Sequence, residues 1–314
     1  MNFDAIVMTA VVGGEGLIEF CPYCRSKNIK MKYRRHFHKM SPGYGPFDFF
    51  VCEDCGCGFN NPMPSNDQIR RFYSSYSSGM PEEFRAAMKQ GQDSSWHSQI
   101  AYDLLEIATE QGFESDFTWL DVGAGAGEIA EKLSRLSPKS CGTCVDLHQA
   151  PERIDGSNIN WLQQDINSDF SSVVGKKFKL VYASAVLEHV VDPERFLINC
   201  LDLTEPGGAF YFFCPDYSSL AAKVMGQRWP YYLPGEHVTL PTKNSIRACL
   251  SRFLSANKID DCDFHVRSKR VSYSVQYMLF ALKLRWLGKF FPFDFSLKFP
   301  TGALEAILVK RKKV

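Results

Sequence analysis

Apolar and polar positions in the second half of the chain alternate between short hydrophobic runs and longer amphipathic stretches. Short runs of β-branched and aromatic residues predict strands, and apolar residues spaced three or four apart predict helices. Strands that alternate with helices in this way are typical of βαβ units, which form one mostly parallel sheet. The pattern predicts seven strands, at Thr118–Val122, Gly142–Asp146, Ile159–Gln163, Leu180–Ala183, Ala209–Cys214, about Ile259–Val266 and Leu304–Lys310.

The same pattern predicts helices before and between these strands. They are expected near Ser95–Gln111, Glu128–Leu136, Asp192–Leu203, Lys243–Phe253 and Tyr273–Leu287. The remaining chain differs in composition. Residues 63–115 are polar and helix-prone, whereas residues 1–62 are rich in Cys, Gly, Pro and aromatic side chains with little helical period. We therefore expect three regions, 1–62, 63–115 and 116–314.

Composition places the chain among ordinary globular proteins, with 45% hydrophobic and 23% charged residues. The formal net charge of +1 provides no global field that would recruit nucleic acid or an anionic membrane. No apolar run approaches the ~20 residues that cross a bilayer, and the N-terminus lacks the pattern of a signal peptide. We expect a cytoplasmic protein, in which the 11 cysteines are free or bind metal rather than forming disulfides.

A glycine-rich turn follows the first predicted strand, in the stretch "TWLDVGAGAGEIAEKL" that begins at Thr118. Glycine permits positive φ and a close approach of a ligand to the backbone, and the next helix aims its free N–H groups at an anionic group. A dinucleotide-binding turn has a third glycine where this chain has Glu128, and a carboxylate there faces a pyrophosphate badly. A turn without a ligand remains the alternative.

Two acidic residues end the next strands of the predicted sheet. Asp146 lies about 20 residues after the glycines, where a carboxylate can accept hydrogen bonds from ribose hydroxyls. Asp165 ends the third strand, and a turn-forming role is its alternative. Because Asp146 suits any adenosine-containing cofactor, it does not distinguish NAD from other cofactors.

Four motifs in order resemble class I S-adenosylmethionine-dependent methyltransferases. They are the glycine turn, "YASAVLEHVVDPERFL" from Tyr182, "EPGGAFYFFCPD" from Glu205 and the later "GEHVTLPTKNSIRACLSRF". The resemblance covers roughly Ser95–Val314 and is closest to the branch that contains ubiquinone and sugar O-methyltransferases. It implies a Rossmann-like α/β fold with a mostly parallel seven-stranded sheet in the order 3-2-1-4-5-7-6, the last strand being antiparallel.

The resemblance also implies S-adenosylmethionine as the cofactor, with its methionine half over the glycine turn. Asp146 would hold the ribose, and Asp165 would read the adenine amino group. The cofactor-binding residues expected from these positions are Asp121, Gly123, Ala124, Gly125, Gly127, Asp146, Leu147, Asp165, Ile166 and Ala183.

Two C-x-x-C pairs in the first region predict a zinc site. Cys21 and Cys24 form one pair and Cys52 and Cys55 the other, and two such pairs can provide four thiolates for tetrahedral zinc. The residues between them indicate two strands joined by a Gly/Pro turn, which suits a zinc ribbon. A redox pair or plain core cysteines are the alternatives. Cys57 could replace one ligand.

Other residues with metal-binding chemistry fit less well. His36 and His38 are one residue apart, so their side chains point to opposite faces of a strand. Cys141 and Cys144 share the C-x-x-C spacing, but they lie in the second strand of the large sheet, where we expect buried packing.

The first region as a whole, "CPYC … CEDCGCGFNNPMPSNDQIRRFYSSY", resembles a zinc-ribbon leader that precedes this methyltransferase domain in many bacterial proteins. Several of those proteins are associated with sugar or surface-glycan modification. The resemblance implies a ribbon at 1–62, a helical linker and cofactor lid at 63–115, and a methyltransferase domain at 116–314 with acceptor-site insertions in 216–300. Tyr73 and Tyr76 either cover the cofactor or pack the linker helix.

Methyl transfer to a hydroxyl needs an aligned nucleophile and a proton acceptor. His189 is the first candidate base because it follows the fourth strand and has an unperturbed pKa near 6.5. Glu188 could orient it or bind the cofactor. His237 is the second candidate and Asp216 the third, and each has a purely structural alternative.

These observations predict an O-directed methyltransferase that acts on a sugar, a glycan intermediate or another small metabolite. One alternative is an RNA methyltransferase whose ribbon, with "KNIKMKYRRHFHK", holds nucleic acid, although the net charge argues against it. Others are a non-catalytic zinc-ribbon scaffold and an NAD-dependent oxidoreductase. The aromatic and basic segment Ser272–Phe295 is expected to form a helix that packs on the sheet or lines the acceptor pocket or, less readily, touches a membrane interface.

Overall fold

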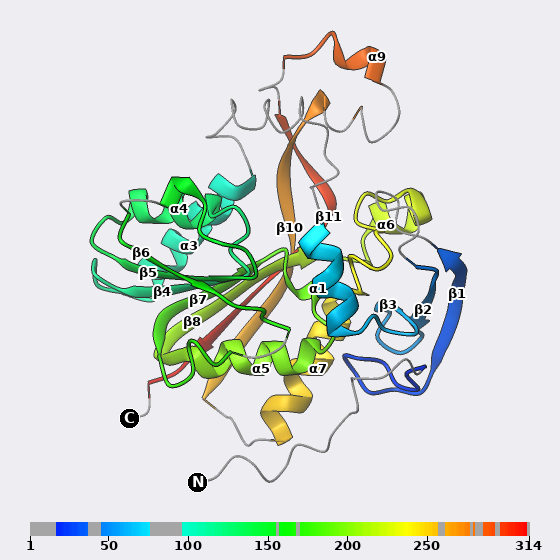
Figure 1. Ribbon diagram of the computed structural model, residues 1–314, viewed down its shortest axis with the longest axis horizontal. Coiled ribbons are helices and arrows are strands. Elements are labelled where there is room, and N and C mark those ends of the chain that lie inside the picture. The colour runs from blue at the N-terminus through cyan, green and yellow to red at the C-terminus, as the bar shows by residue number, and fades with distance from the viewer. Residues whose placement is uncertain are drawn as a thin grey trace.

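The computed structural model describes residues 17–36, 45–75, 96–154, 157–167, 170–256, 261–276, 279, 285–292 and 296–312. A large sheet with helices on both faces forms one side of the molecule, and a small sheet forms the other (Figure 1). Two long antiparallel strands extend from the large sheet toward the top of the view. His38, all of 76–95 (which includes Tyr76) and about half of 277–295 lie outside the described residues.

The large sheet has the strand order β10-β11-β8-β7-β4-β5-β6. Its strands are β4 (Thr118–Val122), β5 (Cys141–Asp146), β6 (Ile159–Gln163), β7 (Phe178–Ser184), β8 (Thr204–Pro215), β10 (Cys262–Ser274) and β11 (Ser296–Lys310). Pairing is parallel from β6 across to β8, and β11 is antiparallel to both β8 and β10. The predicted order 3-2-1-4-5-7-6, with an antiparallel last strand, is confirmed.

Helices cover the two faces of this sheet. The longer ones are α3 (Trp96–Glu110), α4 (Glu128–Leu136), α5 (Pro193–Leu203) and α7 (Lys243–Ala256). The other helices are α1 (Asn66–Ser75), α6 (Leu220–Met225), α9 (Arg285–Gly288), η2 (Glu152–Ile154), η3 (Leu187–His189) and η4 (Gly226–Arg228). Figure 1 shows α3 and α4 on one face and α5 and α7 on the other.

The strand β8 shows why both faces need covering. Phe210 and Phe212 point into the core beneath α5 and α7, whereas Tyr211 and Phe213 point into the core beneath α3 and α4. Side chains alternate between the faces of a strand, so a continuous apolar run is stable only when both faces are buried. Phe210 is fully buried, and its replacement by alanine should cost about 3–5 kcal/mol.

The small sheet contains β1 (Ile29–His36), β2 (Phe47–Cys52), β3 (Gly58–Asn60) and β9 (Thr239–Leu240), in that order and all antiparallel. The two strands predicted between the cysteine pairs are present as β1 and β2. Gly58 is needed because a Cβ there would lie 2.2 Å from the ring of Phe49. The fourth strand, β9, comes from within the predicted acceptor-site insertions, so distant parts of the chain build this sheet together.

The predicted helix Tyr273–Leu287 is wrong at its start. β10 continues to Ser274, with Tyr273 paired to Leu297 and Ser274 to Ser296 of β11. The long antiparallel partner supplies hydrogen bonds that local propensity does not reveal. Among the described residues beyond Ser274, Val275, Gln276 and Leu279 are helical and α9 follows. Within the described part of the chain, no helix is long and apolar enough to cross a membrane.

Candidate functional site

The glycine turn lies at the carboxyl end of β4, between this strand and α4. Gly123, Gly125 and Gly127 have φ values of 76°, 55° and 71°, a backbone conformation that residues other than glycine rarely adopt. A Cβ on Gly123 would lie 2.6 Å from the side chain of Val186, and one on Gly127 would lie 3.0 Å from that of Ile154. Among the described residues, no atom lies within 4 Å of a Cβ built on Gly125. The turn is therefore packed at both ends and open at its middle glycine.

Asp146 ends β5 beside this open position. Its carboxylate accepts hydrogen bonds from the Gly125 N–H at 2.8 Å and from the His148 N–H at 2.9 Å, and the His148 ring lies 3.0 Å away. The residue is buried, with 8% of its surface exposed. A carboxylate has about four acceptor sites, so this one can also accept hydrogen bonds from the hydroxyls of a ligand. Ala124 and Leu147 flank the same corner, and both are half-buried.

Asp121, the last residue but one of β4, is buried below the turn. Burial disfavours its charged form and raises the pKa of Asp121 to about 8, with Asp146 adding a smaller effect in the same direction. Within the described ranges of the chain, no cation shifts this pKa. A ligand ammonium brought to this carboxyl would stabilise its ionised form. Ala183, another predicted cofactor contact, is buried in the neighbouring β7.

Asp165 is engaged by a helix from the first part of the chain. Arg70 of α1 places its Nε and Nη2 atoms 3.2 Å from the Asp165 carboxylate, which also accepts a hydrogen bond from the Asn167 N–H. The Arg70 side chain is half exposed, so this ion pair contributes at most about 1 kcal/mol. A ligand that binds Asp165 would therefore displace Arg70 at modest cost.

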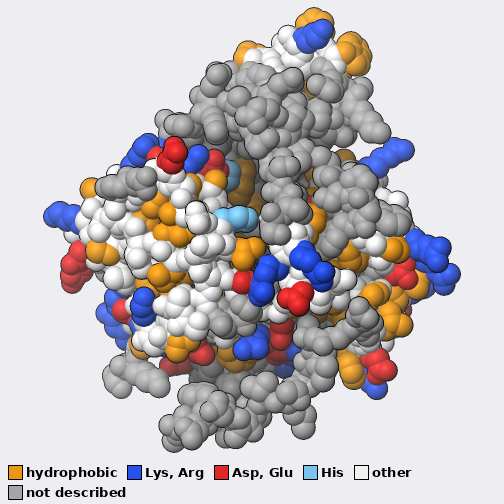
Figure 2. Space-filling view, viewed as in Figure 1, with side chains coloured by type: hydrophobic (Ala, Val, Ile, Leu, Met, Phe, Trp, Pro, Cys, Tyr) orange, Lys and Arg blue, Asp and Glu red, His pale blue; other side chains and the backbone are white. Residues whose placement is uncertain are grey.

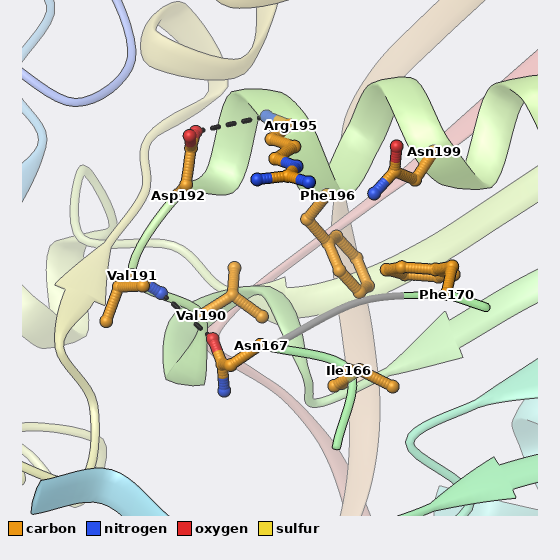
Figure 3. Close-up of a pocket in the computed structure, with 9 residues that line it drawn as sticks. All are labelled: Ile166, Asn167, Phe170, Val190, Val191, Asp192, Arg195, Phe196 and Asn199. Atoms are coloured by element: carbon orange, nitrogen blue, oxygen red, sulfur yellow. Dashed lines mark hydrogen bonds between the residues drawn. The ribbon is translucent and has the colours of Figure 1, made fainter. Parts of the chain in front are cut away.

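Ile166 lines a small pocket rather than a cofactor-sized cleft. The pocket lies between the loop after β6 and the start of α5, with Phe170 and Phe196 facing each other across it (Figure 3). The Asn167 side chain accepts a hydrogen bond from the Val191 N–H at its edge. A volume of about 30 Å³ holds a single water molecule. An adenine ring does not fit there.

Two histidines meet beside the glycine turn. His189 ends η3, directly after β7, and His237 lies just before β9. Their ring centroids are 4.7 Å apart, with an angle of 80° between the planes. Val186, whose side chain packs on Gly123, is three residues before His189. The histidine pair is therefore connected, through Val186, to the segment that packs on the glycine turn.

The ring nitrogens of both histidines have defined partners. Nδ1 of His237 lies 2.7 Å from the Tyr231 carbonyl, and Nδ1 of His189 lies 3.0 Å from the Glu236 carbonyl. A carbonyl can only accept, so each Nδ1 carries a proton and each Nε2 keeps its lone pair. The Tyr73 hydroxyl lies 2.6 Å from the same Nδ1 of His189. Burial holds the pKa of His189 below its usual value, which keeps the ring neutral.

Glu188 is the buried acid of this cluster. Its Oε1 lies 3.9 Å from Nε2 of His189, and its Oε2 has no hydrogen-bond partner in the part of the chain that the structure describes. Burial, and to a smaller extent the Glu236 carboxylate, raises the pKa of Glu188 to about 8. Ligand atoms of Glu188, His189 and His237 all lie within 4.8 Å of one another, a donor set that can share a proton or bind a divalent cation.

Asp216, the third candidate base, has a structural role in this fold. Its carboxylate accepts hydrogen bonds from the backbone and hydroxyl of Ser218, and Lys243 lies 3.8 Å away. These contacts are those of a turn-forming aspartate after a strand.

The two cysteine pairs come together as the spacing predicts. The Sγ atoms of Cys21, Cys24, Cys52 and Cys55 lie within 4.8 Å of one another. Cys21 is 3.5 Å from Cys55, and Cys24 is 3.5 Å from Cys52. Tetrahedral zinc with Zn–S bonds of about 2.3 Å separates its sulfurs by about 3.8 Å, so this donor set fits the ion. The neighbouring thiols lower the pKa of Cys21 to about 2, which favours a thiolate there.

Other sulfurs and histidines are placed differently. Cys57 is buried only 3.2 Å from Cys21 and remains a possible substitute ligand. The expectation that Cys141 and Cys144 are both buried is wrong for Cys141, which is exposed at the start of β5, whereas Cys144 is fully buried. His36 packs its ring against Tyr33 and Tyr232, away from the cysteines.

Sequence reasoning missed the partners that hold the histidines. Glu236 and Tyr231 act through their carbonyls, which no side-chain motif reveals. One signal was available, because the tripeptide Glu-His-Val occurs twice, at Glu188 and at Glu236. Tyr73 was weighed as a cover for the cofactor or as helix packing, and its hydroxyl instead contacts His189.

Comparisons with known proteins agree with this architecture. A family model described as "Methyltransferase domain" matches residues 94–253, just over half of the chain. A ubiquinone biosynthesis O-methyltransferase of Coxiella burnetii (strain RSA 493 / Nine Mile phase I) is 32% identical over 98 residues, which are 30% of this chain and 41% of that protein. The enzyme of the same name from Parvibaculum lavamentivorans is 26% identical over 114 residues, 34% of this chain and 43% of that protein. The chain thus spans about two fifths of the length of these curated relatives.

Two solved structures share the fold at low sequence identity. The plantazolicin methyltransferase BamL, in complex with a triazolic desmethylPZN analog and SAH, has a TM-score of 0.54 at 17% identity, covering 77% of this chain and 94% of that chain. The plantazolicin methyltransferase BpumL, in complex with a monoazolic desmethylPZN analog and SAH, has a TM-score of 0.51 at 15% identity, covering 78% and 94%. Together with the family model, this fold shows that the chain belongs to the class I S-adenosylmethionine-dependent methyltransferases.

Proposed function

We propose that the protein transfers a methyl group from S-adenosylmethionine to a hydroxyl oxygen of a small molecule, with a sugar or glycan precursor as the favoured acceptor. One observation carries this proposal: the turn that bears Glu188 and His189 packs directly on the open glycine turn, through Val186 and Gly123. A proton acceptor and a cofactor cradle therefore share one edge of the sheet, the carboxyl edge where ligands of open α/β sheets bind.

Several residues would hold the cofactor. The free space at Gly125 would admit its backbone-contacting part, and Asp146 beside it would accept the ribose hydroxyls. The buried Asp121 would meet the ammonium, and Asp165 the adenine, after release of Arg70. When bound, the cofactor supplies a methyl group on a sulfonium, which is already a good electrophile. The protein has to align the acceptor and to remove a proton.

The histidine pair supports an oxygen acceptor. A hydroxyl must lose its proton as the new bond forms, and the free Nε2 of neutral His189 suits this role. His237, with its Nδ1 held in the same way, is the second acceptor for that proton. Glu188, neutral below about pH 8 and 3.9 Å from Nε2 of His189, would add no negative charge beside the base. The O-methyltransferases among the relatives also support oxygen.

A sugar-like acceptor agrees with the ribbon's resemblance to leaders of glycan-modifying proteins. The surface gives less support to RNA, because basic and acidic side chains are interspersed on the described part of the face in Figure 2. Arg25 of the ribbon is also engaged internally, by Glu194 at 2.6 Å. Zinc bound by Cys21, Cys24, Cys52 and Cys55 would serve a structural role.

Calorimetry with S-adenosylhomocysteine and with NAD tests the cofactor. We expect binding of the first only, and Asp146→Asn should weaken it at least about tenfold, because an amide accepts fewer hydrogen bonds. Asp263→Asn is the matched control, since Asp263 pairs with Arg311 on the surface away from the turn. Folded wild-type protein with no affinity for S-adenosylhomocysteine would refute the proposal.

The acceptor class is tested with S-adenosylmethionine and three panels: nucleotide-activated sugars, phenolic metabolites and RNA. Mass spectrometry should detect the gain of one methylene on a sugar. Methylation of RNA alone, with salt-dependent binding, would replace the proposed acceptor.

A further inference from the structure

Both cysteine knuckles contact the short segment that follows His237. Tyr23, fully buried between Cys21 and Cys24, places its hydroxyl 3.1 Å from Oγ1 of Thr239. On the second knuckle, the Cys55 carbonyl accepts a hydrogen bond of 2.6 Å from the Thr242 hydroxyl. The metal-binding loops therefore touch β9 and its flanks directly.

The strand after the second knuckle holds the same segment through its backbone. β3 pairs with β9, and the Asn60 N–H donates to the Val238 carbonyl at 2.9 Å. The Asn60 side chain also lies 3.4 Å from the carbonyl of His237. The backbone of His237 is thus anchored to the small sheet rather than to the large one.

The hydroxyl of Thr239 extends this connection to the other histidine. Its Oγ1 lies 3.4 Å from the Leu187 carbonyl, and Leu187 begins the η3 turn that ends with His189. Since a carbonyl only accepts, Thr239 donates to Leu187 and must accept from the Tyr23 hydroxyl. The two hydrogen bonds therefore run in one direction, with Tyr23 donating to Thr239 and Thr239 donating to Leu187. One hydroxyl, fully buried, links a metal knuckle with the turns that carry both histidines.

We propose that Thr239 is a positioning residue, through which the cysteine ribbon sets the separation and orientation of His189 and His237. Neither carrier is rigid alone, because β9 has two residues and η3 is a single turn of three. Groups that share a proton must be held to about 0.5 Å, which needs external support. The small sheet provides it. The effect of these contacts on catalysis rests on the proposed function, whereas their effect on the placement of the two histidines does not.

The test uses full-length protein with selectively ¹⁵N-labelled histidine. Thr239→Val removes the hydroxyl and keeps the branched shape, and Thr239→Ser restores the hydroxyl. Thr204→Val is the matched control, because Thr204 is also fully buried and donates a hydrogen bond to the Cys200 carbonyl. Thr204 begins β8, at the end of this strand that lies away from the histidines. The measurements are the ring pKa values and tautomers of His189 and His237, the metal content and the affinity for S-adenosylhomocysteine.

In Thr239→Val we expect the pKa of His189 to rise by about 0.5 or more, because a loosened η3 admits water to a ring whose pKa is lowered by burial. Among the residues that the structure describes, the charged or titratable groups that face this ring are Glu188, Glu236, His237 and Tyr73, and the substitution changes none of them. Metal content and cofactor affinity should stay within twofold of wild type. Thr239→Ser and Thr204→Val should keep the wild-type pKa.

Unchanged ring pKa values and tautomers in folded Thr239→Val would overturn the proposal, and so would an equal change in Thr204→Val. If Thr239→Val does not fold, Tyr23→Phe removes only the first hydrogen bond, and an unshifted His189 in that variant overturns it equally. Absence of S-adenosylhomocysteine binding by wild-type protein is a separate result. It refutes the proposed function, while the ring measurements still report on Thr239.

Discussion

Single alanine substitutions in the turn between β4 and α4 separate its packing role from its binding role. Gly123→Ala and Gly125→Ala add the same methyl group to residues with positive φ, 76° and 55°. Holding an alanine in this left-handed conformation should lower the free energy of unfolding of each variant by about 1–2 kcal/mol. Only at Gly123 does the new Cβ collide with a buried side chain, 2.6 Å from Val186. That overpacking adds about 1–3 kcal/mol.

We therefore expect Gly123→Ala to lower the free energy of unfolding by about 2–5 kcal/mol and Gly125→Ala by about 1–2 kcal/mol. Urea unfolding, with equal slopes for both variants, measures this difference. The order should reverse for the ligand. The Gly125 methyl group projects into the open space where the cofactor is expected, so affinity for S-adenosylhomocysteine should fall at least about tenfold, or about 1.4 kcal/mol.

Two results would contradict this reasoning. Equal destabilisation by both substitutions would show that Val186 yields to the new methyl group and does not clamp the turn. Unchanged S-adenosylhomocysteine affinity in Gly125→Ala would show that no ligand lies over the middle glycine, and the proposed cofactor site would then be elsewhere.

Three further predictions concern the buried acid, the proposed base and the proposed metal site. The pKa of Asp121 is raised in the folded state, so its contribution to stability is present below about pH 4 and is lost as the pH rises through about 8; Asp121→Asn should flatten this decline in urea unfolding between these limits. His189→Ala should keep S-adenosylhomocysteine affinity within twofold in calorimetry and reduce methyl transfer about 10²-fold or more in single-turnover assays. Cys52→Ser should abolish stoichiometric zinc, measured by atomic absorption, and lower the melting temperature, whereas Cys249→Ser, at a buried thiol outside the cluster, should retain zinc.

The parts of the fold that were predictable from sequence are those whose signals are local. β4, β6 and α4 have the predicted bounds, because each is an apolar or amphipathic run that ends at glycine or polar turn residues. The cysteine cluster was predictable because ligand spacing is dictated by tetrahedral geometry. The motif order likewise predicted the strand order of the large sheet.

The contacts that sequence could not reveal are distant along the chain. Tyr73 and His189 are 116 residues apart, and Tyr23 and Thr239 are 216 residues apart. The extension of β10 over the predicted helix has the same origin, since its partner β11 lies beyond the helical pattern. Tertiary hydrogen bonds decide these features, and local propensity carries no trace of them. The roles of the predicted cofactor residues stay predictions, with Asp165 bound to Arg70 in this structure.

The ribbon and the sheet domain share one hydrophobic core, which has a thermodynamic consequence. Cys21, Tyr23 and Phe59 belong to the same buried cluster as Val190 and Leu250. Glu194 of α5 also accepts from Arg25 of the ribbon at 2.6 Å and from Arg252 of α7 at 2.9 Å. A metal bound only by the folded ribbon stabilises every element that unfolds with it. If the proposed zinc binds there, its affinity is therefore linked to the stability of the whole shared core, and a chain cut after the ribbon would expose this core rather than release an intact domain.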